Sequence, residues 1–427
     1  MISKIAGFSL FFLWVAVSSG YPQEIVELKL DQLVEEAIHN NPDLKAARHE
    51  TASVQARISQ AKAWDPPQVG VEFFKTPVDK FPNPADGSME MDYFVQQMIP
   101  FPGKRRAASR AAESSAAMTG GNYRTLEKKI IRDVKSAVYA LYFVQWKIRI
   151  NSENQDLMHE FTEIAKRQYE VGMGNQADIL RSQTELSILI NEGINLEQEI
   201  KSAEAVINTL LSRPTNGPLG NVPDIVADPP EATFDQLKAL AREVRPELQS
   251  MREYIAMNQA EVSAAELDVY PDFMVRVMYK DMADTSKDYW STMGTASIPL
   301  ALWSRGSFKG KIQEKNQILR KSEEDFRAME NTVLFQIQDA LVNVESNRNL
   351  AALYKNTLIP QTEQTLYSTR SAYQTGKTAF FSLIDVYRML LDARLNYHRS
   401  AMKTMESIAE LEQAVGLDLS EMKQRIQ

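Results

Sequence analysis

The chain has 427 residues, 44% of them hydrophobic and 24% charged, with no cysteine. This composition is typical of a folded protein, and the lack of cysteine excludes disulfides and thiolate metal sites. The 48 basic and 56 acidic residues give a net charge of −8, which argues against a protein dedicated to binding nucleic acid.

The first 20 residues have the layout of a secretory signal peptide. Lys4 precedes an apolar run over 5–17, which is followed by small residues at 18–20. A membrane-anchoring helix is the alternative, but the run is short for a membrane span. We therefore expect residues 1–20 to be removed on export. Without cysteine, we also expect no lipid anchor on the mature protein.

The sequence contains an internal repeat with a shift of 204 residues. An apolar seam with coiled-coil spacing over 130–148 also returns, 203 residues later, over 333–351. Matches in one register over such distances predict two structural units of the same kind. The repeated segments are LDQL (30–33) and FDQL (234–237), NPDL (41–44) and RPEL (245–248), and YEVG (169–172) and YQTG (373–376).

A segment with five prolines and two glycines over 213–233 reads as a connection between the units. We expect a first repeat over 21–211, a linker over 212–233, a second repeat over 234–416 and a tail over 417–427. Both repeats are expected to have the order helix, strand, strand, long helix, tip turn, helix. The expected helices are 42–65, 103–172, 177–211, 306–375 and 380–416, and the expected strands are 66–77, 89–101, 271–281 and 288–299.

Apolar and polar residues alternate in the strand segments, most clearly at 273–280, as in strands that face lipid on one side. Four strands cannot close a barrel, and open edges in lipid leave backbone groups unpaired. Three copies giving 12 strands are the simplest closed solution. Each long helix of 70 residues would span about 105 Å, and such helices with narrow apolar seams must pack side by side. The sequence thus predicts the wall of a tube.

These features resemble the TolC-like outer-membrane efflux proteins over nearly the whole mature chain. The resemblance rests on the Asn-Pro-Asp-Leu and Arg-Pro-Glu-Leu helix starts, the Tyr-x-x-Gly turns and the strand-loop-strand inserts. It implies a mainly α protein with a small β part. It also implies a homotrimer with a 12-strand barrel in the outer membrane and a 12-helix barrel in the periplasm, serving a periplasmic adaptor and an inner-membrane RND-type pump. The alternative is a periplasmic coiled-coil adaptor or scaffold without a membrane barrel.

The segment 96–105 looks like the strand-to-helix junction of the heavy-metal cation efflux branch, which often carries Gly-Lys-Arg there. The second repeat has Ile298-Pro299-Leu300 at this place without that triplet. Cations at a helix N-terminus oppose the helix dipole, and outer-membrane lipid headgroups could compensate them; the alternative is a solvated charged face. The candidate junction residues are Gly103, Lys104, Arg105 and Arg106.

The Tyr-x-x-Gly turns end the long helices, at the end farthest from the strands. The resemblance implies that these tips touch the adaptor and form the closed aperture; ordinary turn residues are the alternative. The candidate contact residues are Tyr169, Gly172, Met173, Gln176, Gly376, Lys377 and Thr378.

Family members often carry carboxylates six and nine residues after the second turn glycine. Here Ser382 and Asp385 hold those places, so the pattern is half kept, and Asp178 lies six residues after Gly172. We expect a ring of Asp385 carboxylates at the aperture, with Ser382, Asp178 and Tyr373 beside it; a solvated helix carboxylate is the alternative.

No catalytic, cofactor or metal site is indicated by the sequence. The four histidines show no ligand spacing, and methionines are more often adaptable packing than ligands. There is no HExxH, phosphate-binding loop or nucleophile elbow. We expect no enzyme activity.

Overall fold

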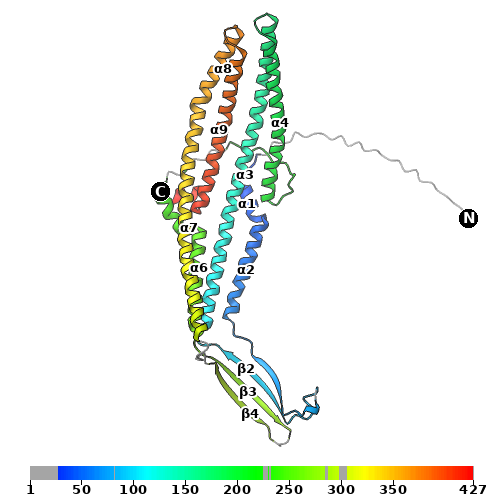
Figure 1. The fold of residues 1–427 in the computed structure, drawn as a ribbon, viewed down its shortest axis with the longest axis vertical. Helices are drawn as coiled ribbons and strands as arrows, with labels where there is room; N and C mark the ends of the chain where they lie inside the picture. Colours follow the sequence, from blue (N-terminus) through cyan, green and yellow to red (C-terminus); the bar gives the residue numbers. More distant parts are fainter. Residues whose placement is uncertain are drawn as a thin grey trace, which may run out of the picture.

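The computed structural model describes residues 27–80, 82–224, 229, 232–283, 287–297 and 305–426. The predicted signal peptide and the 298–300 junction lie outside the described residues. The molecule is long and narrow, with helices over most of its length and a sheet at one end (Figure 1).

The first repeat begins with two short helices that are separated at Asn41. Asn41 precedes Pro42 and has an extended ψ of 126°, because the proline ring disfavours helical geometry in the residue before it. The elements are α1 (Leu30–Asn40), α2 (Pro42–Lys62), β1 (Gln68–Phe74), the 3-10 turn η1 (Val78–Lys80), β2 (Glu90–Ile99), α3 (Lys104–Glu170) and α4 (Gln176–Leu210).

The second repeat has the same order of elements, with one interruption and one addition. Its elements are α5 (Phe234–Val244), α6 (Pro246–Leu267), β3 (Asp272–Met282), β4 (Tyr289–Ser297), α7 (Arg305–Leu353), the π-helical turn η2 (Tyr354–Leu358), α8 (Ile359–Gln374), α9 (Phe380–Val415) and α10 (Leu419–Ile426). The helices α1, α5 and α10 are not among those expected from the sequence.

The expected helix over 306–375 is divided by the π-helical turn. Pro360 has no N–H to donate, and its ring would clash with the carbonyl of Asn356 in a regular helix. The N–H of Ile359 instead bonds the carbonyl of Tyr354, five residues back. The wider turn accommodates the proline, which has no counterpart in the first repeat.

Two equivalent hydrophobic cores show that the repeat is structural. One core contains Leu33, Ala37, Leu44, Ile207 and Leu211. The other has the residues 204 positions later, Leu237, Ala241, Leu248, Leu411 and Val415. Each core joins a short helix pair to the middle of a long helix and to the end of α4 or α9. The expectation of two structural repeats is confirmed.

The helices form a single layer whose neighbours change along its length. Near the sheet, α2, α3, α6 and α7 lie side by side, and toward the other end the order is α4, α3, α9 and α7/α8 (Figure 1). The 67 residues of α3 span about 100 Å, so α2 and α4 can pack against it one after the other. The helices therefore form a wall of nearly constant thickness.

Both repeats contribute to one antiparallel sheet with the strand order β1-β2-β3-β4. The repeats meet where β2 pairs with β3, with Val95 opposite Val277. In the described part of the chain, β1 and β4 have no neighbour on their outer edges. The sheet is therefore open on both sides within one chain.

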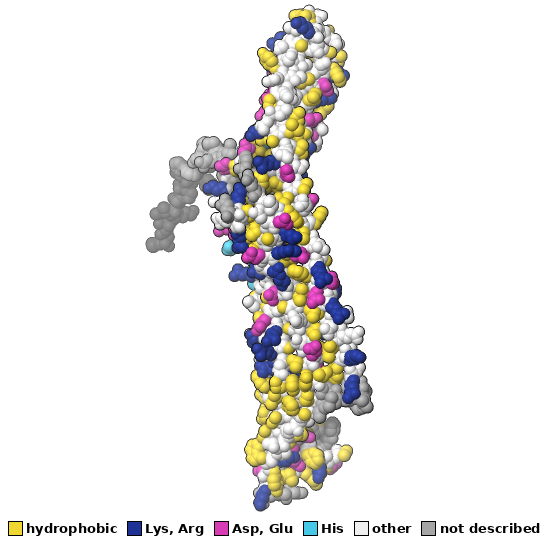
Figure 2. Space-filling view, turned by 90° about the vertical axis from the view of Figure 1, so that its left-hand side faces the viewer, with side chains coloured by type: hydrophobic (Ala, Val, Ile, Leu, Met, Phe, Trp, Pro, Cys, Tyr) yellow, Lys and Arg dark blue, Asp and Glu magenta, His cyan; other side chains and the backbone are white. Residues whose placement is uncertain are grey.

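The two faces of the sheet differ in chemistry. Cross-strand partners on one face are apolar, and their side chains are exposed: Val69, Val95 and Val277 lie in one row. The other face carries an ionic cluster in which Nζ of Lys280 lies 2.5 Å from a carboxylate oxygen of Glu90 and 3.0 Å from one of Asp92. Figure 2 shows hydrophobic side chains gathered over this end of the molecule. Among the described helices, none is long and apolar enough to cross a membrane.

Candidate functional site at the hairpin tips

The two hairpins, α3/α4 and α8/α9, end in turns of the same geometry. In the first turn the N–H of Gly172 bonds the carbonyl of Tyr169 (3.0 Å), and the N–H of Met173 bonds that of Gln168 (2.8 Å). The second turn repeats both bonds 204 residues later, from Gly376 and Lys377. This is the Schellman arrangement, which satisfies the last carbonyls of a helix.

Both turns require glycine for a physical reason. Gly172 and Gly376 have φ values of 76° and 70°, in the left-handed region that strains residues with a Cβ atom. The tips also approach each other, since a Cβ atom on Gly376 would lie 3.4 Å from Cε of Met173. The turn positions thus lie together at the end of the molecule opposite the sheet (Figure 1).

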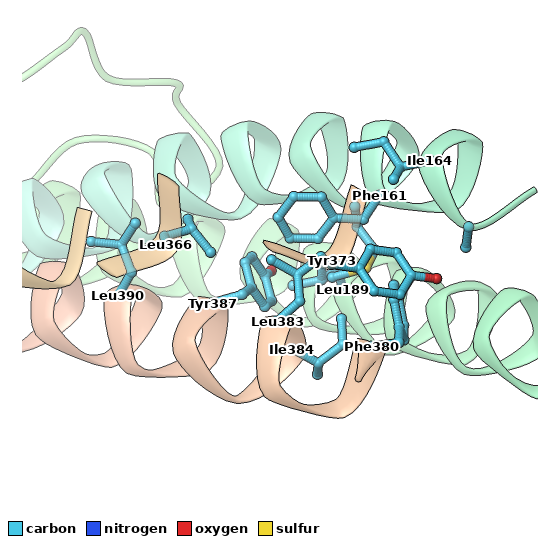
Figure 3. Close-up of a cluster of buried hydrophobic side chains, with 12 residues drawn as sticks. Phe161, Ile164, Leu189, Leu366, Tyr373, Phe380, Leu383, Ile384, Tyr387 and Leu390 are labelled. Carbon is cyan, nitrogen blue, oxygen red and sulfur yellow. The ribbon is translucent and has the colours of Figure 1, made fainter. Parts of the chain in front are cut away.

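A buried apolar cluster joins the two hairpins behind their tips. Phe161 of α3 packs edge-on against Tyr387 of α9, and Tyr373 of α8 packs beside Phe380 of α9. Figure 3 shows these rings turned toward one another, with Leu189 of α4 in the same cluster. Burial of large side chains at about 25 cal/mol per Å² of apolar surface holds the hairpins against each other.

Polar contacts also cross from one hairpin to the other. Nε2 of Gln168 donates to the carbonyl oxygen of Gln374 (2.8 Å), and the hydroxyl of Tyr373 donates to Oδ2 of Asp178 (3.4 Å). Ion pairs that cross between the hairpins join Arg370 to Glu160, Arg388 to Glu185 and Arg394 to Glu153. These three pairs were not predicted from the sequence, because charge type alone does not reveal which helix faces meet.

The tyrosines of the two turns have different surroundings. Tyr373 is only 4% exposed, whereas Tyr169 is 50% exposed. Burial, together with the negative charge of Asp178, raises the pKa of Tyr373 to about 12. Its hydroxyl therefore remains protonated and able to donate at any physiological pH. Asp178 lies at the start of α4, where its backbone N–H donates a hydrogen bond to Oδ1 of the helix-capping residue Asn175.

The structure places the other predicted tip residues mostly on the surface. Asp385 is exposed on α9, and its carboxylate makes no hydrogen bond or ion pair with a described residue. Ser382, one turn earlier, is half-buried. Of the predicted aperture residues, the structure brings together only Asp178 and Tyr373. The exposed members of the predicted contact set are Tyr169, Gly172, Met173, Gln176, Gly376 and Lys377, while Thr378 is half-buried.

At the other end, the predicted junction residues have separate roles. Nζ of Lys104 lies 2.9 Å from both carboxylate oxygens of Asp272, which also accepts the N–H of Phe101. The expectation that lipid compensates Lys104 is therefore corrected: its charge is paired inside the chain, and it ties α3 to β3. Arg105 stacks over the ring of Trp64 (4.4 Å), and Arg106 is exposed.

Among the residues that the structure describes, no group of three or more His, Asp or Glu side chains could hold a metal ion. His398 is engaged in packing. Its ring stacks on Trp146 at 3.8 Å between centroids, and its Nδ1 lies 3.3 Å from the hydroxyl of Tyr142.

Comparisons with known proteins agree with this geometry. The family model described as "Outer membrane efflux protein" matches residues 33–213 and 237–417, two spans that are themselves 204 residues apart. The cobalt-zinc-cadmium resistance protein CzcC of Cupriavidus metallidurans is 22% identical over 405 residues, covering 93% of this chain and 92% of its own.

Solved structures of outer-membrane channels share the fold. CusC superimposes with a TM-score of 0.78 at 16% identity, over 93% of this chain and 96% of its own. VceC of Vibrio cholerae gives 0.78 at 17% identity, over 91% and 96%. Neither the fold nor the comparisons favour an adaptor without a membrane part. Matched through both of its repeats, the chain belongs to the outer membrane efflux protein family and is the outer-membrane duct of an efflux system, with its helical mass in the periplasm.

Proposed function

We propose that three copies of the chain close one 12-strand barrel and one 12-helix tube. The observation that carries this proposal is the sheet, which has an exposed apolar face and, among the described residues, two unpaired edges at β1 and β4. Unpaired strand edges cost several kcal/mol per backbone group in lipid, so β4 of one copy has to pair with β1 of the next.

The helical layer supports the same assembly. The helices at its two margins expose large apolar side chains: Ile188, Ile190 and Ile194 on α4, and Phe335, Val342 and Leu350 on α7. Such rows bury their apolar surface when the margin of one copy packs against the opposite margin of the next. The sheet and the helices thus favour the same head-to-tail ring.

The hairpin tips form the closed end of the proposed tube. Contacts between α3/α4 and α8/α9, including the bond from Tyr373 to Asp178, hold the tips in one arrangement. Opening then requires these contacts to break when an adaptor engages the exposed tip residues. In the ring, three copies of Asp385 face a common axis and favour the passage of cations.

Heavy-metal cations are the proposed cargo. The relative CzcC is named for resistance to cobalt, zinc and cadmium. We assign the pump to the inner-membrane RND type, with a periplasmic adaptor between pump and duct. In this proposal the cargo crosses the duct without a resident metal site.

Two measurements test this function. Membrane fractionation should place the mature chain in the outer membrane, as a detergent-stable trimer without a lipid anchor. A monomer that is soluble without detergent would refute the proposed function.

Single-channel recording in a planar bilayer should then show a lower cation preference for Asp385→Ala than for the wild type. Unchanged conductance and selectivity would remove Asp385 from the aperture while leaving the duct itself intact.

A further inference from the structure

We propose that a cavity at the start of α3 binds the phosphodiester headgroup of an anionic glycerophospholipid of the inner leaflet of the outer membrane. The inference depends on the proposed function in one respect, namely that the apolar face of the sheet lies in lipid. It assigns a site at the other end of the molecule from the tips.

The cavity has a volume of about 530 Å³ and lies between the end of α2 and the start of α3. Lys62, Arg105 and Arg106 contribute cations to its lining, and Ile99 and Phe101 contribute apolar surface. Trp64 also lines the cavity.

The position of the cavity matches the headgroup level of a membrane. Ile99 pairs with Phe273 on the apolar face of the sheet, so that face leads directly into the cavity. Trp64 is 54% exposed beside it, and Phe101 stacks on Tyr270 at 4.6 Å between centroids. Aromatic side chains of this kind concentrate where membrane proteins cross from hydrocarbon to headgroups. Figure 2 shows Lys and Arg side chains gathered where the helices meet the apolar sheet end.

The described residues do not balance the charges in the cavity. Lys62 is paired with Glu113 at 2.7 Å. Arg105 donates from Nη2 to the carbonyl of Lys62, but its Nε is buried and has no hydrogen-bond partner among the described residues. Arg106 forms no ion pair in the described part of the chain. The guanidinium groups of Arg105 and Arg106 thus have no counter-charge among the described residues.

The backbone adds to this imbalance. No side chain caps α3 at Gly103, so its first N–H groups lack a side-chain acceptor, and the basic residues there oppose the helix dipole. An anion beside Arg105 and Arg106 would relieve both effects. Guanidinium groups bind phosphate oxygens through paired N–H donors, and the acyl chains would continue along the apolar face of β1 and β2. A phospholipid satisfies the charge and the apolar surface together.

Lipid selectivity in nanodiscs tests the site with the whole trimer. The probes are phosphatidylglycerol and phosphatidylcholine, each brominated on the acyl chain near the headgroup, in unbrominated phosphatidylcholine. The readout is quenching of the Trp64 fluorescence. This fluorescence is the difference between the signal of the wild type and that of the Trp64→Phe variant. We expect phosphatidylglycerol to quench at concentrations about tenfold lower than phosphatidylcholine, because the two guanidinium groups attract a headgroup with net negative charge more strongly than a zwitterionic one.

The double variant Arg105→Gln/Arg106→Gln should quench equally with both lipids. The matched control, Lys201→Gln/Lys423→Gln, removes two exposed cations from other parts of the molecule and should keep the preference. Equal quenching of the wild type by both lipids would overturn the proposal, as would a preference that survives in Arg105→Gln/Arg106→Gln. No quenching by either lipid would show that a neighbouring copy covers the cavity, and would overturn it too.

A further arm separates lipid from soluble anion. Glycerol phosphate at millimolar concentration should leave the quenching by phosphatidylglycerol unchanged. If glycerol phosphate instead competes with the lipid, the ligand of the site is a free phosphate and the proposal of a lipid is wrong. The double variant should still form trimers that conduct ions in phosphatidylcholine bilayers. Failure of the lipid site is therefore distinguishable from failure of the proposed duct.

Discussion

The hydroxyl of Tyr373 donates a hydrogen bond to the carboxylate of Asp178 across the two hairpins, over 3.4 Å and 195 positions of sequence. It joins the end of the second long helix to the start of α4. The equivalent tyrosine of the first repeat, Tyr169, is exposed and has no such partner among the described residues. The repeat is thus asymmetric at the hairpin tips.

Tyr373→Phe should loosen the tips. The substitution removes one hydrogen bond to a charged group, which contributes about 1.5 kcal/mol per chain, while keeping the ring in its apolar cluster. We expect longer open times in single-channel recordings of the variant than of the wild type. Tyr169→Phe is the matched control and should not differ from the wild type. Equal open times in all three proteins would show that this bond does not hold the aperture.

Reversal of one charge between the hairpins should have a salt-dependent effect. Arg388→Glu places a carboxylate beside Glu185, so we expect higher conductance at low ionic strength. The double variant Arg388→Glu/Glu185→Arg should restore the wild-type value. Because the arginine is exposed, the pair contributes no more than about 1 kcal/mol, and the effect should fade in 1 M salt. An effect that is the same at both salt concentrations would point to packing instead of charge.

Gly376→Ala should cost about 1 kcal/mol of stability, because alanine is strained at a φ of 70°. Gly120→Ala gives a contrasting control, since that glycine lies within α3 and a Cβ atom there meets nothing within 4 Å. We expect this control to stabilise the protein slightly through the better helix propensity of alanine. Urea unfolding followed by circular dichroism measures both changes, and equal effects of the two substitutions would contradict the turn geometry.

The stability of the helical layer should fall with acidity through His398. Burial lowers the pKa of His398 from 6.5 to about 4; Asp224 opposes the shift, and Arg149 adds to it. Between pH 6.5 and pH 4, His398 is therefore protonated in the unfolded chain and neutral in the folded chain. Stability is fully present above pH 6.5 and declines toward pH 4, by about 2 kcal/mol per chain at pH 5.

His398→Gln should abolish most of the difference in urea midpoint between pH 7 and pH 5. His159→Gln changes an exposed histidine of α3 and should leave that difference as in the wild type. If the His398 variant keeps the whole difference, other groups dominate the acid sensitivity.

Much of the architecture was predictable because it depends on periodicity and length. The 204-residue shift places Leu33 and Leu237 in equivalent cores, and alternation over 273–280 defines the two faces of β3. Two short helices can stand against one long helix because their lengths agree. The separate helices α1 and α5 were missed, although Pro42 and Pro246 mark a break in the preceding residue.

The candidate site was harder to predict because it depends on which helix faces meet. Glycines at 172 and 376 were found because the turns require them. The partners of Tyr373, Arg388 and Lys104 are all more than 150 residues away in sequence. Charge type reveals that a side chain needs a partner, and only the packed helices reveal which one. Pro360 was visible in the sequence, but the π-helical turn that accommodates it was not.

The duplicated fold has a consequence for anything that docks on the tips. Equivalent positions in the two turns carry different side chains, an apolar thioether at Met173 and an ammonium group at Lys377. A closed ring of copies would present these chemistries in alternation around its rim. A docking protein with one kind of binding loop would therefore contact two chemically different sites in alternation. Its affinity for neighbouring hairpins would differ in strength and in sensitivity to salt.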